Sequence, residues 1–322
     1  MILVTILLLI VGLAILIAGA DILVRGTASI SKKYGIAPIV IGLTVVSFGT
    51  SAPELVINLI SATNGSPDLA IGNILGSNIS NILLILGISA LFVELKVKKS
   101  TTWKEIPFAA LSIIALAILG NDVFLDGAIM NSLTRTDGLI LLGFFSIFMY
   151  YIFELFKNSK NTEPEDQKIK TYSMGKSVAF TILGIVGLIA GGQLLVSQAT
   201  ILATLAGMSE MLIGLTVVAV GTSLPELATS VVAAIKGQSD IAIGNVVGSN
   251  IFNVFWILGV TSVVTPLSIN QFARQDIMIN LAVTVLLFAF LFIGKKHTIQ
   301  KWQGVVLILL YVLYTIFIIM RG

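Results

Sequence analysis

Two glutamates follow the same short polar motif, and each motif interrupts a long apolar stretch. The motif reads Gly-Thr-Ser-Ala-Pro-Glu at residues 49–54 and Gly-Thr-Ser-Leu-Pro-Glu at residues 221–226. A carboxylate inside an apolar membrane segment costs roughly 2.5–3.5 kcal/mol to insert, so such a residue is a functional candidate by default. No lysine, arginine or histidine is placed in the sequence to neutralise both Glu54 and Glu226. We therefore expect a bound cation, or a proton in its absence, to supply the missing positive charge.

The proline of each motif predicts a break in its helix. Proline lacks the N–H of the helix ladder and clashes with the carbonyl one turn earlier, and Pro53 and Pro225 each follow a glycine by four residues. The breaks should free backbone carbonyls around residues 46–50 and 218–222, which lipid tolerates only where they line a cavity or meet a ligand. Carboxylates, hydroxyls and carbonyls are hard oxygen ligands, which suit Ca²⁺ and Na⁺ better than Zn²⁺ or Cu⁺.

A second polar block follows each motif. It reads Gly-Asn-Ile-Leu-Gly-Ser-Asn-Ile-Ser-Asn at residues 72–81 and Gly-Asn-Val-Val-Gly-Ser-Asn-Ile-Phe-Asn at residues 244–253. The glycines of each block have the spacing of closely packed membrane helices. In each block a serine precedes an asparagine by four residues, which puts both on one helix face; the pairs are Ser77 with Asn81 and Ser249 with Asn253. These faces can complete an oxygen cage opposite the glutamates.

The composition excludes a water-soluble globular protein. Charged residues make up 11% of the chain and hydrophobic residues 57%, whereas soluble domains carry roughly 25% charged residues. The absence of cysteine excludes disulfides and thiolate metal sites. The apolar runs predict an all-α membrane protein with about ten transmembrane helices, near residues 1–25, 37–62, 69–93, 105–121, 137–156, 175–200, 209–235, 241–264, 275–294 and 302–320. Helices 2, 3, 7 and 8 carry the polar blocks, and we expect them to be broken or kinked around a central ion site.

The chain repeats itself. Residues 42–87 align with residues 214–259 at a constant offset of 172, and about 26 of the 46 positions are identical. The predicted organisation is a first five-helix repeat at 1–156, a cytoplasmic linker at 157–174 and a second five-helix repeat at 175–322. Because each half has an odd number of spans, the second copy is inverted, and transporters built this way bind ions near the membrane midplane.

Basic residues predict the orientation. With the N-terminus outside, only three of the 19 basic residues fall on the outer side, and these are Arg135, Arg274 and Arg321. Cytoplasmic loops are enriched in lysine and arginine. The pattern therefore predicts a multi-pass protein of the cell membrane with both termini outside.

The paired blocks resemble the α1 and α2 repeats of the calcium/cation antiporter superfamily, which includes the Na⁺/Ca²⁺ exchangers. The resemblance covers both repeats and the five-plus-five layout, and prokaryotic exchangers are the most similar. It implies that Ca²⁺ is coordinated by Glu54, Glu226, Thr50 and Thr222. It implies Na⁺ sites that draw on the side chains of Ser51, Ser77, Ser223 and Ser249 and on the backbone carbonyls of Ser47 and Ala219. The mid-site amide and acid of the family fall at Asn81 and Asn253.

Asn253 departs from the family pattern. Exchangers of this type often carry an aspartate in one repeat at this position, whereas both repeats of this chain offer an amide. Asparagine has the shape of a protonated aspartate, so the site geometry should survive. The four positions Glu54, Glu226, Asn81 and Asn253 then carry a total charge of −2, enough for one Ca²⁺ or two Na⁺. K⁺-dependent members rely on the missing acid, so we expect no K⁺ transport.

The predicted function is secondary active antiport that exchanges Na⁺ for Ca²⁺ by alternating access. An exchanger that couples Ca²⁺ or another divalent cation to H⁺ is the first alternative, and a cation channel is a weaker one. An enzyme is not expected, because the carboxylates are not accompanied by a nucleophile–histidine pair, an HExxH motif or a nucleotide motif. We expect no cofactor, and the expected partners are metal cations and the lipid bilayer, with no nucleic acid and no obligatory protein partner.

Overall fold

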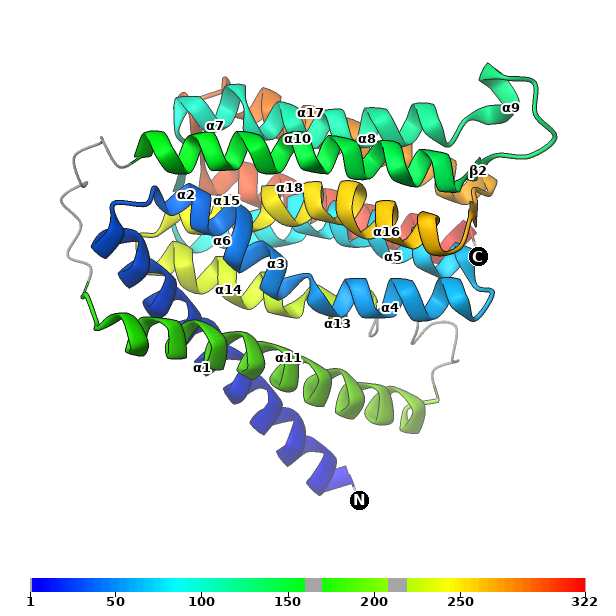
Figure 1. Cartoon of the computed structure of the whole chain (residues 1–322). Coiled ribbons are helices and arrows are strands. Elements are labelled where there is room, and N and C mark those ends of the chain that lie inside the picture. Colours follow the sequence, from blue (N-terminus) through cyan, green and yellow to red (C-terminus); the bar gives the residue numbers. More distant parts are fainter. Residues whose placement is uncertain (1, 160–169, 208–218, 322) are drawn as a thin grey trace.

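The computed structural model describes residues 2–159, 170–207 and 219–321, and this part of the chain is almost entirely helical (Figure 1). Eight of the described helices are long and apolar enough to cross a membrane. Five of them are α1 (Ile2–Tyr34), α10 (Arg135–Ser159), α11 (Met174–Leu205), α17 (Gln271–Phe290) and α18 (Lys301–Arg321). The other three are composite: α5 (Pro67–Ser80) with η2 (Asn81–Ile85) and α6 (Leu86–Phe92), α7 (Lys99–Trp103) with α8 (Glu105–Leu119), and α15 (Ser239–Ile251) with η4 (Phe252–Leu258) and α16 (Gly259–Val264).

The predicted second span is a bent pair of helices. Its first part runs through α2 (Pro38–Ile41), the π-helical segment η1 (Gly42–Val46) and α3 (Ser47–Thr50). After a bend of 46° the chain continues as α4 (Ala52–Thr63). The predicted seventh span, residues 209–235, is described only as α13 (Ala219–Thr222) and α14 (Leu224–Ile235), because its residues 209–218 lie outside the described part. Every described span lies close to its predicted position.

Some helices continue beyond the predicted spans. The first span was predicted to end at residue 25, but α1 extends to Tyr34. Polar residues end the membrane-embedded part of a helix without ending the helix itself, which explains the difference. Likewise α10 extends to Ser159, into the predicted linker 157–174, and α11 begins at Met174. Residues 160–169 of that linker lie outside the described part of the chain.

The breaks in the predicted helices 2 and 7 fall at equivalent serines. Ser51 separates α3 from α4 with φ −85° and ψ 6°, and Ser223 separates α13 from α14 with φ −85° and ψ 2°. Each proline then occupies the first turn of the following helix, where its missing N–H costs no hydrogen bond. Helices 3 and 8 widen into π-helix at η2 and η4, which is a deformation common at functional sites. All four helices thus depart from regular α-helix, as predicted.

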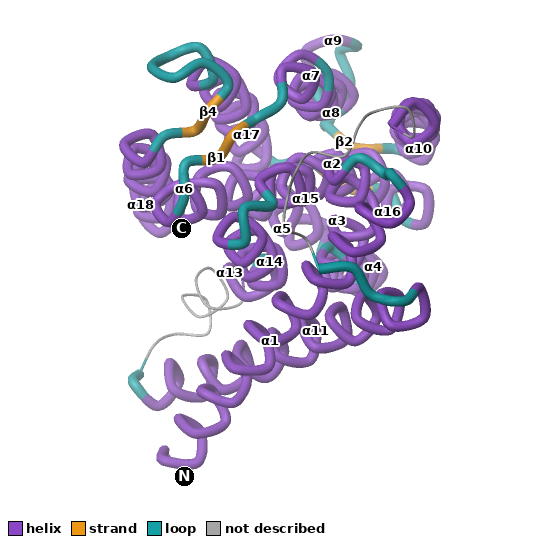
Figure 2. The backbone as a smooth tube through the Cα atoms, turned by 90° about the vertical axis from the view of Figure 1, so that its left-hand side faces the viewer, coloured by secondary structure: helices purple, strands orange, loops and turns teal. Residues whose placement is uncertain are grey.

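The two spans that carry the second polar block lie at the centre of the molecule. In the most apolar stretch of α15–η4–α16, 94% of residues are buried, against 22% for α1. Figures 1 and 2 show α1 and α11 along one side of the bundle, with α8, α10 and α17 on the opposite side. The loops add two short antiparallel pairs that were not predicted, between β1 (Leu95–Lys96) and β4 (Thr298–Ile299) and between β2 (Ser132–Leu133) and β3 (Leu267–Ser268).

Glycines allow α1 and α11 to cross in close contact. A Cβ added at Gly191 would lie 2.5 Å from the backbone nitrogen of Leu16, and one added at Gly19 would lie 2.8 Å from that of Leu188. These two contacts are related by the 172-residue offset of the repeat. Small residues let membrane helices approach until their backbones touch. The crossing is therefore a two-fold contact between equivalent helices of the two halves.

We expect Gly191→Leu to push α1 and α11 apart and to destabilise the protein by about 1–3 kcal/mol, the usual cost of overpacking. The matched control is Gly143→Leu on α10, where no described atom lies within 4 Å of an added Cβ. The thermal unfolding midpoint of the detergent-purified protein measures both effects. An equal decrease for the two variants would contradict the close crossing.

Candidate cation-binding site

The polar motif residues of four spans meet in the interior of the bundle. Glu54 and Glu226 each occupy the third position of the helix that follows a break, in α4 and in α14. Both side chains are fully buried, and they are close enough to repel each other electrostatically. Helix N-termini favour negative charge because their first N–H groups are unpaired and the helix dipole is positive there. The breaks therefore place two carboxylates where the backbone partly stabilises them.

Glu226 is held by hydroxyl groups of the first repeat. The Ser51 hydroxyl donates a hydrogen bond to Glu226 Oε1 at 2.9 Å, and it lies 3.0 Å from the hydroxyl of Ser249. The hydroxyl of Thr50 also faces this carboxylate. The second oxygen, Oε2, is buried and has no hydrogen-bond partner in the described part of the chain. One oxygen of this carboxylate thus stays available for a ligand.

Glu54 is surrounded by the equivalent residues of the opposite repeat, but its carboxylate accepts fewer hydrogen bonds. The hydroxyls of Thr222 and Ser77 face its carboxylate. The hydroxyls of Ser77 and Ser223 lie 3.3 Å apart. Neither carboxylate oxygen makes a hydrogen bond of normal geometry with any described residue. A buried acceptor left without a partner costs about 1–3 kcal/mol, and more if it is charged. A cation bound between the two glutamates would remove that cost.

Four asparagines form a reciprocal hydrogen-bond network between α5–η2 and α15–η4. Asn81 Nδ2 donates to Asn250 Oδ1 at 2.9 Å, and Asn253 Nδ2 donates to Asn78 Oδ1 at 2.9 Å. Asn78 and Asn250 also exchange bonds with each other's backbone carbonyl, at 3.3 and 3.2 Å. These bonds fix the orientation of the amides. The Oδ1 atoms of Asn81 and Asn253 are left buried without a partner among the described residues.

Two further asparagines, Asn73 and Asn245, position the motif threonines. Thr50 Oγ1 donates to Asn245 Oδ1 at 3.0 Å, and Thr222 Oγ1 donates to Asn73 Oδ1 at 3.5 Å. Sequence reasoning did not assign these residues, or Asn78 and Asn250, to the site. The available signal was their identity in both repeats at the constant offset of 172.

Most of the predicted ligands are therefore brought together. Ser47 is buried, and its carbonyl accepts the N–H of Ser51 at 2.9 Å and the hydroxyl of Thr50 at 3.3 Å. The helix break was expected to leave this carbonyl without a hydrogen bond, but it accepts two. Ala219 begins α13, directly after the undescribed residues 208–218, so its carbonyl stays a predicted ligand.

Five carboxylate and amide oxygens at this centre are buried without a hydrogen-bond partner among the described residues. They are Glu54 Oε1 and Oε2, Glu226 Oε2, Asn81 Oδ1 and Asn253 Oδ1. The Nδ2 of Asn73 is also without a partner there, but an amide nitrogen is a donor and cannot bind a cation. Carboxylate and amide oxygens are the ligands that hard cations such as Ca²⁺ and Na⁺ prefer. The donor set fits such ions and offers no nitrogen or sulfur ligand of the kind that Zn²⁺ prefers.

Paired discontinuous helices from inverted repeats, meeting at a buried carboxylate pair, define a secondary transporter of cations. The family model described as "Sodium/calcium exchanger protein" matches residues 4–154 and 176–320. The chain belongs to this family, and the predicted family is confirmed.

Similar proteins span the whole chain. A protein of Alkalimonas amylolytica with the provisional name antiporter CaxA is 38% identical, covering 97% of this chain and 98% of its own length. The sodium/calcium exchanger MaX1 of Methanosarcina acetivorans is 31% identical, covering 98% and 99%. A solved structure of the sodium-calcium exchanger NCX_Mj, soaked with zero Na⁺ and Ca²⁺, superposes with a TM-score of 0.83 at 31% identity, covering 97% and 98%. The predicted fold class, an all-α membrane protein of inverted repeats, is confirmed.

We expect Asn250→Leu to destabilise the protein by about 1–3 kcal/mol, because Asn81 Nδ2 would lose its acceptor in a buried position. The exposed Asn64, at the end of α4, provides the control variant Asn64→Leu. Thermal unfolding midpoints in detergent measure both. The pair Asn81→Leu and Asn250→Leu should also be non-additive, since contacting residues couple. Additive effects would show that the network does not act as a unit.

Proposed function

We propose that this chain is a secondary active antiporter that exchanges Na⁺ for Ca²⁺ across the membrane by alternating access. The observation that carries the proposal is the carboxylate pair Glu54 and Glu226, fully buried between inverted repeats. Neither residue forms a salt bridge in the described part of the chain. Membership of the sodium/calcium exchanger family supports the same ions, and the relatives MaX1 and NCX_Mj are named as exchangers of Na⁺ and Ca²⁺.

Charge balance explains why the ions would exchange. Two carboxylates in a low-dielectric interior repel strongly unless cations neutralise them. One Ca²⁺ and two Na⁺ carry the same charge, so each load compensates the site and excludes the other. A site without ions keeps its uncompensated charge, which disfavours movement through the membrane interior. The carrier then changes conformation only when loaded, which is the requirement for coupled exchange.

We assign ligands from the contacts of the described residues. Ca²⁺ takes roughly six to eight oxygens, and we place it between Glu54 and Glu226 with the hydroxyls of Thr50 and Thr222. For Na⁺ we propose the hydroxyl pairs Ser51 with Ser249 and Ser77 with Ser223, the amide oxygens of Asn81 and Asn253, and the carbonyls of Ser47 and Ala219. Ser51 and Ser249 lie 3.0 Å apart and Ser77 and Ser223 lie 3.3 Å apart, so one ion can contact both members of a pair.

The polar segments beside the site differ between the two halves. A cavity of about 350 Å³ between α4, α11 and α14 reaches Thr222, and its lining includes Gln193 and Ser197. The equivalent positions in the first repeat are Asp21 and Arg25. Asp21 pairs with Arg25 at 2.7 Å and also with Lys236 of the loop after α14. Equivalent segments thus line a cavity in one half and form ion pairs in the other, and this asymmetry supports alternating access over a continuous channel.

We further propose that the chain is not an enzyme and resides in the cell membrane of a prokaryote with both termini outside. The most similar relatives include the "Inner membrane protein YrbG" of Escherichia coli, 36% identical over 92% of this chain. The repeats would comprise 1–156 and 175–322 with a cytoplasmic linker at 157–174. In this orientation the cavity beside Thr222 faces outward and the Asp21 ion pairs face the cytoplasm.

The first test is ⁴⁵Ca²⁺ uptake into proteoliposomes under an imposed Na⁺ gradient, a pH gradient or neither. We expect Glu54→Gln and Glu226→Gln each to reduce Na⁺-driven uptake by about a hundredfold or more. Losing one unit charge at about 4 Å from a cation is worth about 4 kcal/mol at an effective dielectric constant of 20.

The matched control is Glu105→Gln, because Glu105 is also a buried glutamate but lies in α8 and bonds to Tyr151. This variant should transport like the wild type. Near-normal uptake by either site variant would reject the proposed site. Uptake that follows the pH gradient alone would assign the function to the H⁺-coupled alternative.

We expect Na⁺-driven Ca²⁺ uptake to be equal with choline and with K⁺ in the bath, because Asn253 supplies no negative charge for a further cation. Asn253→Asp should change the inhibition of Ca²⁺ uptake by Na⁺, since its carboxylate cannot donate to Asn78 Oδ1 as the amide does at 2.9 Å. Uptake assays with increasing Na⁺ on both proteins measure this. A strict K⁺ requirement, or identical Na⁺ inhibition curves, would contradict the role given to Asn253.

A further inference from the structure

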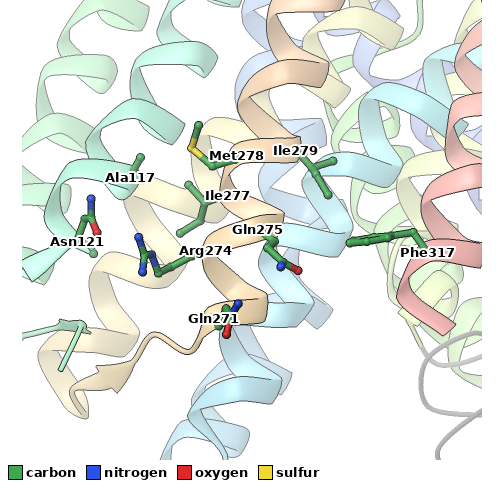
Figure 3. A pocket seen from close by; sticks show the side chains of 10 residues that line it. Ala117, Asn121, Gln271, Arg274, Gln275, Ile277, Met278, Ile279 and Phe317 are labelled. Carbon is green, nitrogen blue, oxygen red and sulfur yellow. The ribbon is translucent and has the colours of Figure 1, made fainter. Parts of the chain in front are cut away.

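A groove separate from the ion site lies where α8 ends and α17 begins, with α18 beside it. Its volume is about 610 Å³, and its lining contains none of the proposed ion ligands. Figure 3 shows Arg274 extending from α17 toward Asn121 at the end of α8, with Ala117 and Met278 farther along the same helices. The groove therefore combines a cation and amide groups at one end with apolar walls leading away from them.

Arg274 carries a charge that no described side chain neutralises. It is exposed and forms no ion pair with an acidic side chain of the described residues. The nearby Asp276 forms an ion pair with Arg321, whose Nη1 donates to Asp276 Oδ1 at 2.9 Å. The amides of Gln271 and Asn121 border the same groove and can donate further hydrogen bonds. Together these groups suit an anion with several oxygens, such as a phosphate group.

The position of the groove favours a lipid over a free phosphate. The polar end lies at the level where α8 ends at Leu119 and α17 begins at Gln271, which is where spans meet the membrane–water interface. Ala117, Met278 and Phe317 continue the lining, and Met278 is 60% exposed. A free phosphate would leave these apolar surfaces unused. A phospholipid covers them with an acyl chain while its phosphate reaches Arg274.

The loop that follows Asn121 provides an independent observation. It contains α9 (Asp122–Leu125), which projects at the edge of the bundle in Figure 1, and it exposes Phe124 by 79% and Met130 by 59%. The loop is nevertheless ordered, because Asp122 Oδ2 accepts the N–H of Ser132 at 2.8 Å and Asn131 Oδ1 accepts that of Val123 at 2.8 Å. Apolar side chains held out from the bundle in this way are unfavourable in water, and burial in a lipid interface stabilises them.

We propose that this groove binds one anionic phospholipid, with its phosphate on Arg274 and an acyl chain along Ala117 and Met278. The amides of Gln271 and Asn121 complete the headgroup contacts. The lipid belongs to the outer leaflet, an assignment that rests on the proposed orientation of the chain. The binding itself depends on neither that orientation nor the transported ions.

The test is native mass spectrometry of the full chain in detergent, titrated with phosphatidylglycerol or phosphatidylcholine. We expect phosphatidylglycerol to bind at least fivefold more tightly than phosphatidylcholine. Arg274→Gln should remove that preference, because the headgroup charge loses its partner. The matched control is Arg135→Gln, since Arg135 is on the same side and its Nε bonds to the carbonyl of Val263 instead of facing the groove.

A second variant and a soluble headgroup separate the remaining outcomes. Ala117→Phe fills the apolar part of the groove and should weaken the binding of phosphatidylglycerol while leaving Arg274 in place. Glycerol 1-phosphate, which has no acyl chain, should not displace the lipid. Equal binding of both lipids by the wild type, or unchanged binding by Arg274→Gln, would overturn the proposal. Displacement by glycerol 1-phosphate would also overturn it, in favour of a free-phosphate site.

Discussion

Two carboxylates are buried between apolar helices, and no cationic side chain of the described residues pairs with them. The rest of the structure depends on this constraint. Glu54 and Glu226 are stabilised first by the backbone, because each stands in the first turn of a helix that begins after a break. Hydroxyl groups of the opposite repeat stabilise them next, as Ser51 does for Glu226. What these groups leave unsatisfied is a set of oxygens that only a cation or a proton can complete. The protein's stability and its ion binding are therefore aspects of one electrostatic problem.

The two inverted repeats surround the glutamates with equivalent residues from each half. Several hydrogen bonds at the centre occur in pairs related by the 172-residue offset, such as Asn81 to Asn250 and Asn253 to Asn78. The bond from Ser51 to Glu226 has no counterpart at Glu54 among the described residues. The helix crossing follows the same rule, with Gly19 against Leu188 and Gly191 against Leu16. The two halves also differ outside the centre, where Asp21 and Arg25 of the first repeat are equivalent to Gln193 and Ser197 of the second. Inverted repeats that are similar at the centre and different around it suit a carrier with two alternative conformations.

The asparagine network also explains why an amide can replace an acid at the site. Asn253 uses its nitrogen as a donor to Asn78 and leaves its oxygen toward the unsatisfied centre. A carboxylate at this position would supply more charge but no donor. Asn253 therefore adds no charge to that of the two glutamates, and its amide has a fixed hydrogen-bond geometry instead. The hydrogen bond to Asn78 gives a defined structural role to Asn253, which departs from the family pattern.

The sequence by itself determined the spans, the inverted repeat, the helix breaks and the glutamates, because each depends on local properties: apolar run length, proline chemistry and identity at a fixed offset. Through the family resemblance it also predicted hydroxyl and amide groups as ligands. Only the tertiary structure decided which hydroxyl faces which carboxylate, the contribution of Asn73, Asn78, Asn245 and Asn250, and the groove beside Arg274. The decisive contacts join residues 146–198 positions apart, as in Ser77–Ser223 and Ser51–Ser249. Such pairs are fixed by how the two halves pack, which no local pattern contains.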